Sequence, residues 1–213
     1  MAGSAMNSRR GVFLVFEGGE GSGKSTQTRL LAAAVERLGR TATITREPGG
    51  SERAESIRNL ILGAESADLD ARTEALLFAA ARADHAEHTI RPALAAGDVV
   101  ISDRYVDSSV AYQGVARGLG AETIRDLSMW ATDDLTPALT IVLDIDPAIG
   151  LKRAEDANRL EAEPIAFHRC VRQAFLDLAA AEPDRYLVIP ADDSPAQIHS
   201  SIWQELTNRG VTA

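Results

Sequence analysis

A glycine-rich stretch near the start of the chain holds the residues best suited to chemistry. Gly18-x-x-x-x-Gly23-Lys24-Ser25 has the spacing of a P-loop, which binds nucleotide phosphates. Glycines let the backbone curl until successive N–H groups point inward and form an anion site. Lys24 can then reach the β- and γ-phosphates, and the Ser25 hydroxyl can ligate Mg²⁺. We therefore assign nucleotide binding to nine consecutive residues: Gly18, Gly19, Glu20, Gly21, Ser22, Gly23, Lys24, Ser25 and Thr26.

The segments on either side of the loop fit this assignment. Residues 12–16 form an apolar run rich in Val and Phe, typical of a strand buried on both faces. After the loop, apolar residues recur at helical spacing from Leu30 to Leu38, and Gly39 follows where a helix would end. This helix would begin near Lys24 and direct its partial positive charge at the phosphates. A glycine-rich turn that matches the P-loop by chance would not explain these flanks.

A later strand ends in a carboxylate that could help to hold the metal. Residues 99–103 read Val-Val-Ile-Ser-Asp, an apolar run that ends in Asp103. This is the usual form of a Walker B element, whose carboxylate holds Mg²⁺ directly or through water. An apolar strand that ends in Asp is weak evidence by itself, but here it follows a P-loop, and the two together indicate a Walker B element. We therefore predict that Ser25 and Asp103 are the protein ligands of Mg²⁺.

Composition limits the kind of protein this can be. The 213 residues are 45% hydrophobic and 25% charged, as in an ordinary globular protein, and we expect one domain from residue 11 to 213 after a loose tail at 1–10. The net charge of −9 argues against a nucleic-acid or anionic-membrane partner. The single cysteine, Cys170, excludes an internal disulfide and fits a cytoplasmic location. No apolar run approaches the roughly 20 residues of a membrane span.

Strand and helix patterns alternate along the whole chain. Five strand candidates lie at residues 12–16, 41–45, 99–103, 139–145 and 186–189. Alternation of this kind predicts an α/β fold with a five-stranded parallel sheet flanked by helices. A longer helix should begin after Asp70, be broken or kinked by Pro92, and end at Gly97. The loop at residues 46–50 follows a strand end, the edge at which open parallel sheets bind ligands.

Several motifs, in this order, resemble those of the thymidylate kinase family, and most closely its bacterial members. They are FEGGEGSGKSTQ (16–27), TREPGG (45–50), LLFAAAR (76–82), SDRY (102–105), SSVAYQG (108–114), and LDIDP with GLKRA (143–154). The P-loop alone is generic, but the other motifs together are specific. The resemblance implies a P-loop nucleoside monophosphate kinase fold. It also implies transfer of the γ-phosphoryl group of ATP to thymidine 5′-monophosphate (dTMP), with Mg²⁺, in a cytoplasmic homodimer.

The resemblance also implies roles for residues that would bind the acceptor. Phe78 would stack on thymine, and Arg82 would hydrogen-bond its edge from the next turn of the same helix face. Arg46 and Arg104 would clamp the acceptor phosphate, since guanidinium groups suit that geometry. Tyr112 would lie against the sugar and disfavour a 2′-hydroxyl. The other acceptor-side candidates are Glu20, Pro48, Ser108, Ser109 and Gln113.

The source of the catalytic positive charge is a separate prediction. In one branch of the resembled family an arginine follows the acidic P-loop residue, and in the other, arginines come from a mobile lid. The residue after Glu20 is not basic here, and by position a short lid falls at about residues 155–163. We predict that its closure brings Arg153, Arg159 or both onto the phosphates. We assign no general base, and the predicted catalytic residues are Lys24, Arg104, Arg153 and Arg159.

Two other functions fit a P-loop chain. Another nucleoside monophosphate kinase could use the same scaffold, although the LLFAAAR motif argues against it. A P-loop switch protein would hydrolyse nucleotide to control a partner. Guanine-specific switches carry an N/T-K-x-D element, and neither Lys24 nor Lys152 stands in one.

Overall fold

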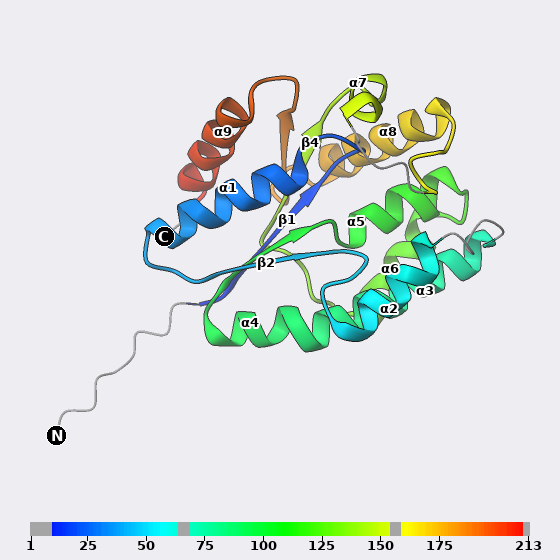
Figure 1. Ribbon diagram of the computed structural model, residues 1–213, viewed down its shortest axis with the longest axis horizontal. Coiled ribbons are helices and arrows are strands. Elements are labelled where there is room, and N and C mark those ends of the chain that lie inside the picture. The colour runs from blue at the N-terminus through cyan, green and yellow to red at the C-terminus, as the bar shows by residue number, and fades with distance from the viewer. Residues whose placement is uncertain (1–9, 64–68, 154–158, 211–213) are drawn as a thin grey trace.

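A computed structural model describes residues 10–63, 69–153 and 159–210 (Figure 1). Residues 1–9 of the predicted tail and 155–158 of the predicted lid lie outside this part of the chain. The strands form one parallel sheet in the order β2-β3-β1-β4-β5, which confirms the predicted α/β fold. Each strand lies within one residue of its predicted bounds: β1 (Val12–Glu17), β2 (Ala42–Arg46), β3 (Val99–Asp103), β4 (Leu139–Asp144) and β5 (Tyr186–Pro190).

Helices cover both faces of the sheet (Figure 1). One face carries α1 (Lys24–Arg37) and α9 (Pro195–Asn208), which pack together. The other face carries most of the remaining helical segments: α2 (Glu52–Leu62), α3 (Ala71–His85), η2 (Ala86–Ile90), α4 (Arg91–Ala96), α5 (Val106–Ser109), η3 (Val110–Ala116), α6 (Ala121–Ala131) and α8 (Ile165–Ala181). The short α7 (Pro147–Arg153) follows β4. No helix in the described ranges is long and apolar enough to cross a bilayer.

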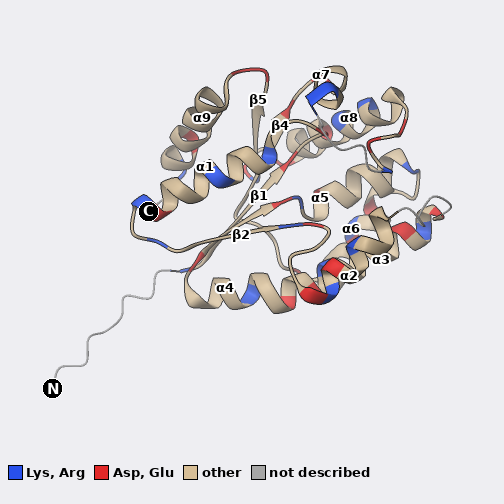
Figure 2. Cartoon of the chain, in the orientation of Figure 1, with Lys and Arg blue, Asp and Glu red and all other residues tan. Residues whose placement is uncertain are grey.

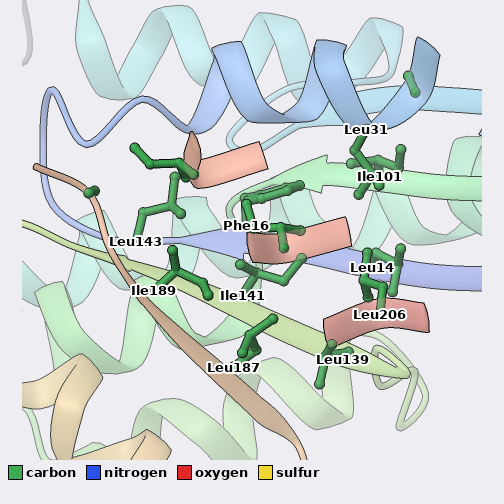
Figure 3. Close-up of a cluster of buried hydrophobic side chains, with 14 of the residues drawn as sticks. Leu14, Phe16, Leu31, Ile101, Leu139, Ile141, Leu143, Leu187, Ile189 and Leu206 are labelled. Atoms are coloured by element: carbon green, nitrogen blue, oxygen red, sulfur yellow. The ribbon is translucent and has the colours of Figure 1, made fainter. Parts of the chain in front are cut away.

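Alternating residues of each strand build a core on each face. Leu14 and Phe16 of β1 belong to the cluster that includes Leu31 of α1 (Figure 3). Phe13 and Val15 belong to the opposite cluster, with Ile90 and other residues of the α3–α6 layer. Because successive side chains of a strand point to opposite faces, a strand covered on both sides must be apolar throughout. This explains the unbroken apolar run before the P-loop.

The helix that contains Pro92 is not broken at that residue. The chain remains helical from α3 through η2 and α4, and η2 is a π-helical turn directly before α4. A proline lacks the N–H of a normal helical bond and crowds the carbonyl four residues earlier, and the wider π-helical turn accommodates both effects. Gly97 ends α4 in a left-handed conformation with φ of 91°, as predicted.

The sheet register brings charged residues to one edge. Phe16 of β1 and Arg46 of β2 are both in register with Asp103 of β3. Because the strands are parallel, their carboxyl ends share this edge with the P-loop and the start of α1. Figure 2 shows charged residues of both signs where these strands end. The edge that the sequence predicts for ligand binding is therefore the one at which several of the predicted site residues lie.

Candidate functional site

A cavity of about 650 Å³ opens at the carboxyl edge of the sheet. The P-loop forms one part of its wall, and the loop after β2, the helix α3 and the segment after β3 form the rest. Most of the predicted site residues line it: Glu20, Gly21, Ser22, Gly23, Lys24, Ser25, Thr26, Arg46, Pro48, Phe78, Asp103, Arg104, Ser108, Ser109, Tyr112, Gln113 and Arg153. Gly18, Gly19, Arg82 and Arg159 are not part of the lining.

The P-loop has the backbone form that phosphate binding requires. Gly21 has φ of 63°, and a Cβ added there would clash with the carbonyl oxygen of Gly150, so this position requires glycine. Helix α1 begins at Lys24, and its N-cap Gly23 provides no side-chain hydrogen bond. The N–H groups of Lys24 and Ser25 therefore remain available to an anion, while the N–H of Thr26 donates to the carbonyl oxygen of Gly23 at 3.1 Å.

The Lys24 ammonium lies over this loop. Its Nζ donates hydrogen bonds to the carbonyl oxygens of Gly18 (3.1 Å) and Gly19 (2.8 Å). Burial lowers the pKa of Lys24, and the positive charge of Arg104 adds to this effect. A phosphate group that neutralises this site would therefore favour the charged form of Lys24.

The two predicted Mg²⁺ ligands lie side by side. The Ser25 hydroxyl donates a 2.8 Å hydrogen bond to Oδ2 of Asp103, although the residues are 78 positions apart in the sequence. The described residues contain no cluster of three or more His, Cys, Asp or Glu side chains suited to a metal. A site with one hydroxyl and one carboxylate fits Mg²⁺, which takes oxygen ligands and usually keeps several waters and substrate oxygens.

Glu20 connects the P-loop to the opposite wall. Its Oε1 accepts hydrogen bonds from Nη2 of Arg104 (2.8 Å) and from the Tyr112 hydroxyl (2.7 Å). The Arg104 guanidinium carbon also lies 5.2 Å from the centre of the Tyr112 ring. Burial alone would raise the pKa of Glu20, but the charges of Arg104 and Lys24 outweigh it and lower the pKa to about 2. Glu20 is therefore ionised and holds both partners at fixed positions.

An arginine that the sequence analysis did not single out joins the predicted Arg46. Arg58 of α2 lines the cavity, and its Nη1 donates to the carbonyl oxygen of Pro48 at 2.7 Å. Arg46 is more exposed and donates from Nη2 to both carboxylate oxygens of Glu55 at 3.1 Å. The sequence did contain a signal for Arg58. This arginine follows the apolar Ala54 by four residues, which places both residues on one face of α2, and Ala54 is buried.

The wall of the cavity around Phe78 is aromatic and polar. Phe78 is almost fully buried, and Ser109 and Gln113 line the cavity with it. Gln113 donates from Nε2 to Oε1 of the buried Glu74 at 2.7 Å, which fixes the orientation of its amide. A flat ring beside fixed hydrogen-bonding groups is the arrangement that a nucleobase requires.

Arg82 lies one layer behind this wall. It is 1% exposed and donates to Oε2 of Glu47 (2.7 Å) and to Oγ of Ser109 (2.8 Å), among others. Its other acceptors are Oγ of Ser128 (3.0 Å) and the carbonyl oxygen of Tyr105 (3.2 Å). Arg82 thus contacts the cavity through Ser109, and its direct hydrogen bond to a base stays a prediction.

The two arginines that lid closure is predicted to bring onto the phosphates lie in different places. Arg153 lines the cavity, and its Nη1 donates to the carbonyl oxygen of Ala191 at 3.0 Å. Arg159 pairs instead with the buried carboxylate of Glu74, so it would have to leave that partner to reach the phosphates. Their catalytic roles stay predictions.

A further carboxylate beneath the site was not assigned from the sequence. Glu17 is the last residue of β1, is fully buried, and accepts hydrogen bonds from the segment that follows Arg104. Burial raises the pKa of Glu17 to about 7, and the nearby carboxylate of Asp107 adds to the rise. The sequence did offer a signal for Glu17: a carboxylate that ends an apolar strand, directly before the P-loop, lies close to the phosphate-binding residues.

Comparisons with known proteins agree on one family. A family model described as thymidylate kinase matches residues 16–202. A thymidylate kinase of Bifidobacterium longum subsp. infantis is 53% identical over 200 residues, which are 92% of this chain and 86% of that protein. One of Deinococcus radiodurans is 43% identical over 94% of this chain and 98% of its own. The crystal structure of thymidylate kinase from Ehrlichia chaffeensis matches with a TM-score of 0.76 and 33% identity, covering 92% of this chain and 99% of that one.

Proposed function

The chain belongs to the thymidylate kinase family, and from this premise we propose that it phosphorylates dTMP to dTDP with ATP. One observation carries the proposal: a single cavity contains both the P-loop and the Phe78 wall. A donor nucleotide on Lys24 and Ser25 would place its γ-phosphoryl group toward the Arg104 side of this cavity. An acceptor with its base against Phe78 would direct its phosphate toward the same region, as in-line transfer requires.

The residues of the P-loop edge would hold the donor. Mg²⁺, held by Ser25 and Asp103, would neutralise part of the charge on the β- and γ-phosphates. We propose that Lys24 exchanges its carbonyl partners in the loop for phosphate oxygens, because these carry full negative charge. Arg153, on the cavity wall after β4, would add positive charge as the phosphoryl group moves.

The acceptor would be bound by arginines at its phosphate and by neutral groups at its base. Arg46, Arg58 and Arg104 surround the region expected for its phosphate, and Tyr112 would lie against the sugar. The attacking atom is an oxygen of a phosphate monoester, whose second pKa is about 6, so it is already ionised at neutral pH. This is consistent with the absence of an assigned general base. Catalysis would then consist of positioning and charge neutralisation.

We also propose that the protein is a cytoplasmic homodimer. Helices α2, α3 and α6 lie side by side in one layer (Figure 1) and expose Leu60, Leu76 and Trp130, the last at 82%. Large apolar side chains gathered on neighbouring helices favour burial against a second copy. The single cysteine and the use of ATP as the donor support a reducing cytoplasm.

The test is a coupled assay of ADP formation with Mg·ATP and a panel of nucleoside monophosphates, with Lys24→Ala as the inactive control. We expect the highest kcat/KM for dTMP. A higher kcat/KM for another nucleoside monophosphate would favour the alternative kinase. ADP formation that does not depend on any acceptor would favour a nucleotide-hydrolysing switch.

A further inference from the structure

We propose that Glu17 is a positioning residue that holds Arg104 in the conformation in which it binds the acceptor phosphate. The inference rests on the proposed function, because Arg104 is there assigned to that phosphate. Glu17 does not line the cavity and has no role in phosphoryl transfer as described above. It is nevertheless a carboxylate placed directly between the P-loop and the segment that follows β3.

Among the described residues, every hydrogen bond that the Glu17 carboxylate accepts comes from the residues just after Arg104. Oε1 accepts the backbone N–H groups of Tyr105 (2.9 Å) and Ser108 (3.0 Å), and Oε2 accepts the Ser108 hydroxyl (2.6 Å). One carboxylate therefore fixes this turn at two of its backbone groups and one of its side chains. Because Glu17 belongs to the central strand β1, the turn is anchored to a strand that is paired on both sides.

Arg104 has a backbone conformation that needs such support. Its φ is 74°, in the left-handed region that non-glycine residues rarely occupy unless their surroundings hold them there. Its N–H donates to the carbonyl oxygen of Phe16 (2.8 Å), and its Nη1 donates to the carbonyl oxygen of Gly18 (3.1 Å). The residues on either side of Glu17 thus bind Arg104 itself, while Glu17 binds the residues that follow it.

The Ser108 hydroxyl links Glu17 to the Arg104 guanidinium. It donates to Oε2 of Glu17 and accepts from Nη1 of Arg104 at 3.0 Å. The carboxylate therefore orients the hydroxyl, and the hydroxyl oxygen then faces the guanidinium. A neutral side chain such as glutamine would fit the same space, but it would present an amide N–H₂ or a weaker acceptor to Ser108.

Stability alone does not account for a carboxylate at this position. Burial disfavours its ionised form, and Asp107 adds to the effect while Arg104 opposes it. A carboxylate that is costly to ionise, yet fixes the turn next to Arg104, fits a role in substrate binding better than a role in folding. Glutamine in its place should therefore leave the fold as stable as before, or more stable, at a pH above 7.

The test is Glu17→Gln, measured at pH 8. We expect the KM for dTMP to rise about tenfold or more, since a hydrogen bond to a charged group is worth about that factor. The KM for ATP should change less than about twofold, and the melting temperature should stay the same or rise.

The matched control is Leu139→Ala, which removes a buried side chain at the far end of the sheet. It should lower the melting temperature and leave both KM values unchanged.

Three outcomes would overturn the proposal: an unchanged KM for dTMP, an equal rise in both KM values, or the same KM pattern in Leu139→Ala. The effect of Glu17→Gln should also disappear in an Arg104→Met background, and additive effects of the two substitutions would contradict action through Arg104.

If Glu17→Gln does not fold, Glu17→Asp provides the same comparison, because it keeps the charge but is too short for all three bonds. If another nucleotide proves to be the acceptor, the proposed function fails, and the same KM comparison with that nucleotide still tests Glu17.

Discussion

Replacing Arg82 with methionine should destabilise the protein far more than the loss of an ordinary ion pair. The Arg82 guanidinium is fully buried and pairs with the equally buried carboxylate of Glu47 at 2.7 Å. Methionine fills a similar volume but supplies no hydrogen-bond donor. After the substitution, the Glu47 carboxylate would retain only the Nδ1 contact with His85, at 3.0 Å, among its side-chain partners described here.

The size of the effect follows from this burial. Removing one partner of a buried ion pair leaves an uncompensated charge and costs about 3–5 kcal/mol. For a domain of this size each kcal/mol lowers the melting temperature by about 2–4 °C, so the expected fall is about 6–20 °C. The matched control is Arg53→Met, because Arg53 pairs with Asp84 at 3.3 Å while its own side chain is 76% exposed. That substitution should cost at most about 1 kcal/mol.

Urea and thermal unfolding of both variants would measure the difference. Adding Glu47→Gln to Arg82→Met should recover part of the lost stability, because the unpaired charge is then gone. A loss from Arg82→Met of less than about 1 kcal/mol, or one equal to that from Arg53→Met, would refute the reasoning. Arg82→Ala should also raise the KM for the acceptor more than that for ATP, because Ser109 on the cavity wall loses its donor.

Four other results are expected. Lys24→Ala should lower activity by about 10²–10³-fold with an unchanged far-UV circular dichroism spectrum, and more than a few per cent residual activity would contradict its assignment. Asp103→Asn should raise the Mg²⁺ concentration needed for half-maximal rate, and an unchanged requirement would remove it from the metal site. Arg153→Ala should lower kcat more than Arg159→Ala, and near-normal kcat in the double variant would eliminate the lid model. Light scattering should give about twice the 22.7 kDa chain mass, whereas one chain mass would refute the homodimer.

Local patterns predicted the fold and the phosphate-binding loop well. A buried parallel strand, a glycine-rich loop and a helix each leave a continuous signal within about 30 residues, and Val12 to Leu38 contains all three. The strand bounds were right to within one residue for the same reason. The π-helical turn before Pro92 could not be predicted, because the sequence does not show how a helix will accommodate a proline.

The roles of single polar residues were harder to predict, because they depend on distant partners. The four hydrogen-bond acceptors of Arg82 lie on three other segments: the loop after β2, the segment after β3, and α6. Its place behind the cavity wall therefore depends on how these segments pack together. Glu17 stands next to the P-loop in the sequence, but its partners are about 90 residues away. Motifs thus predicted which residues line the cavity more reliably than which partners each residue contacts.

The place of β1 in the sheet has a consequence for synthesis of the chain on the ribosome. β1 is made first, yet its neighbours in the sheet are β3 and β4, and the Ser25–Asp103 pair spans 78 residues. At about 5–20 residues per second, β1 and its glycine-rich loop wait about 4–16 s for β3 to be made. During that interval an apolar strand has neither edge paired and could aggregate. Only after β3 has emerged can a nucleotide begin to stabilise the nascent domain.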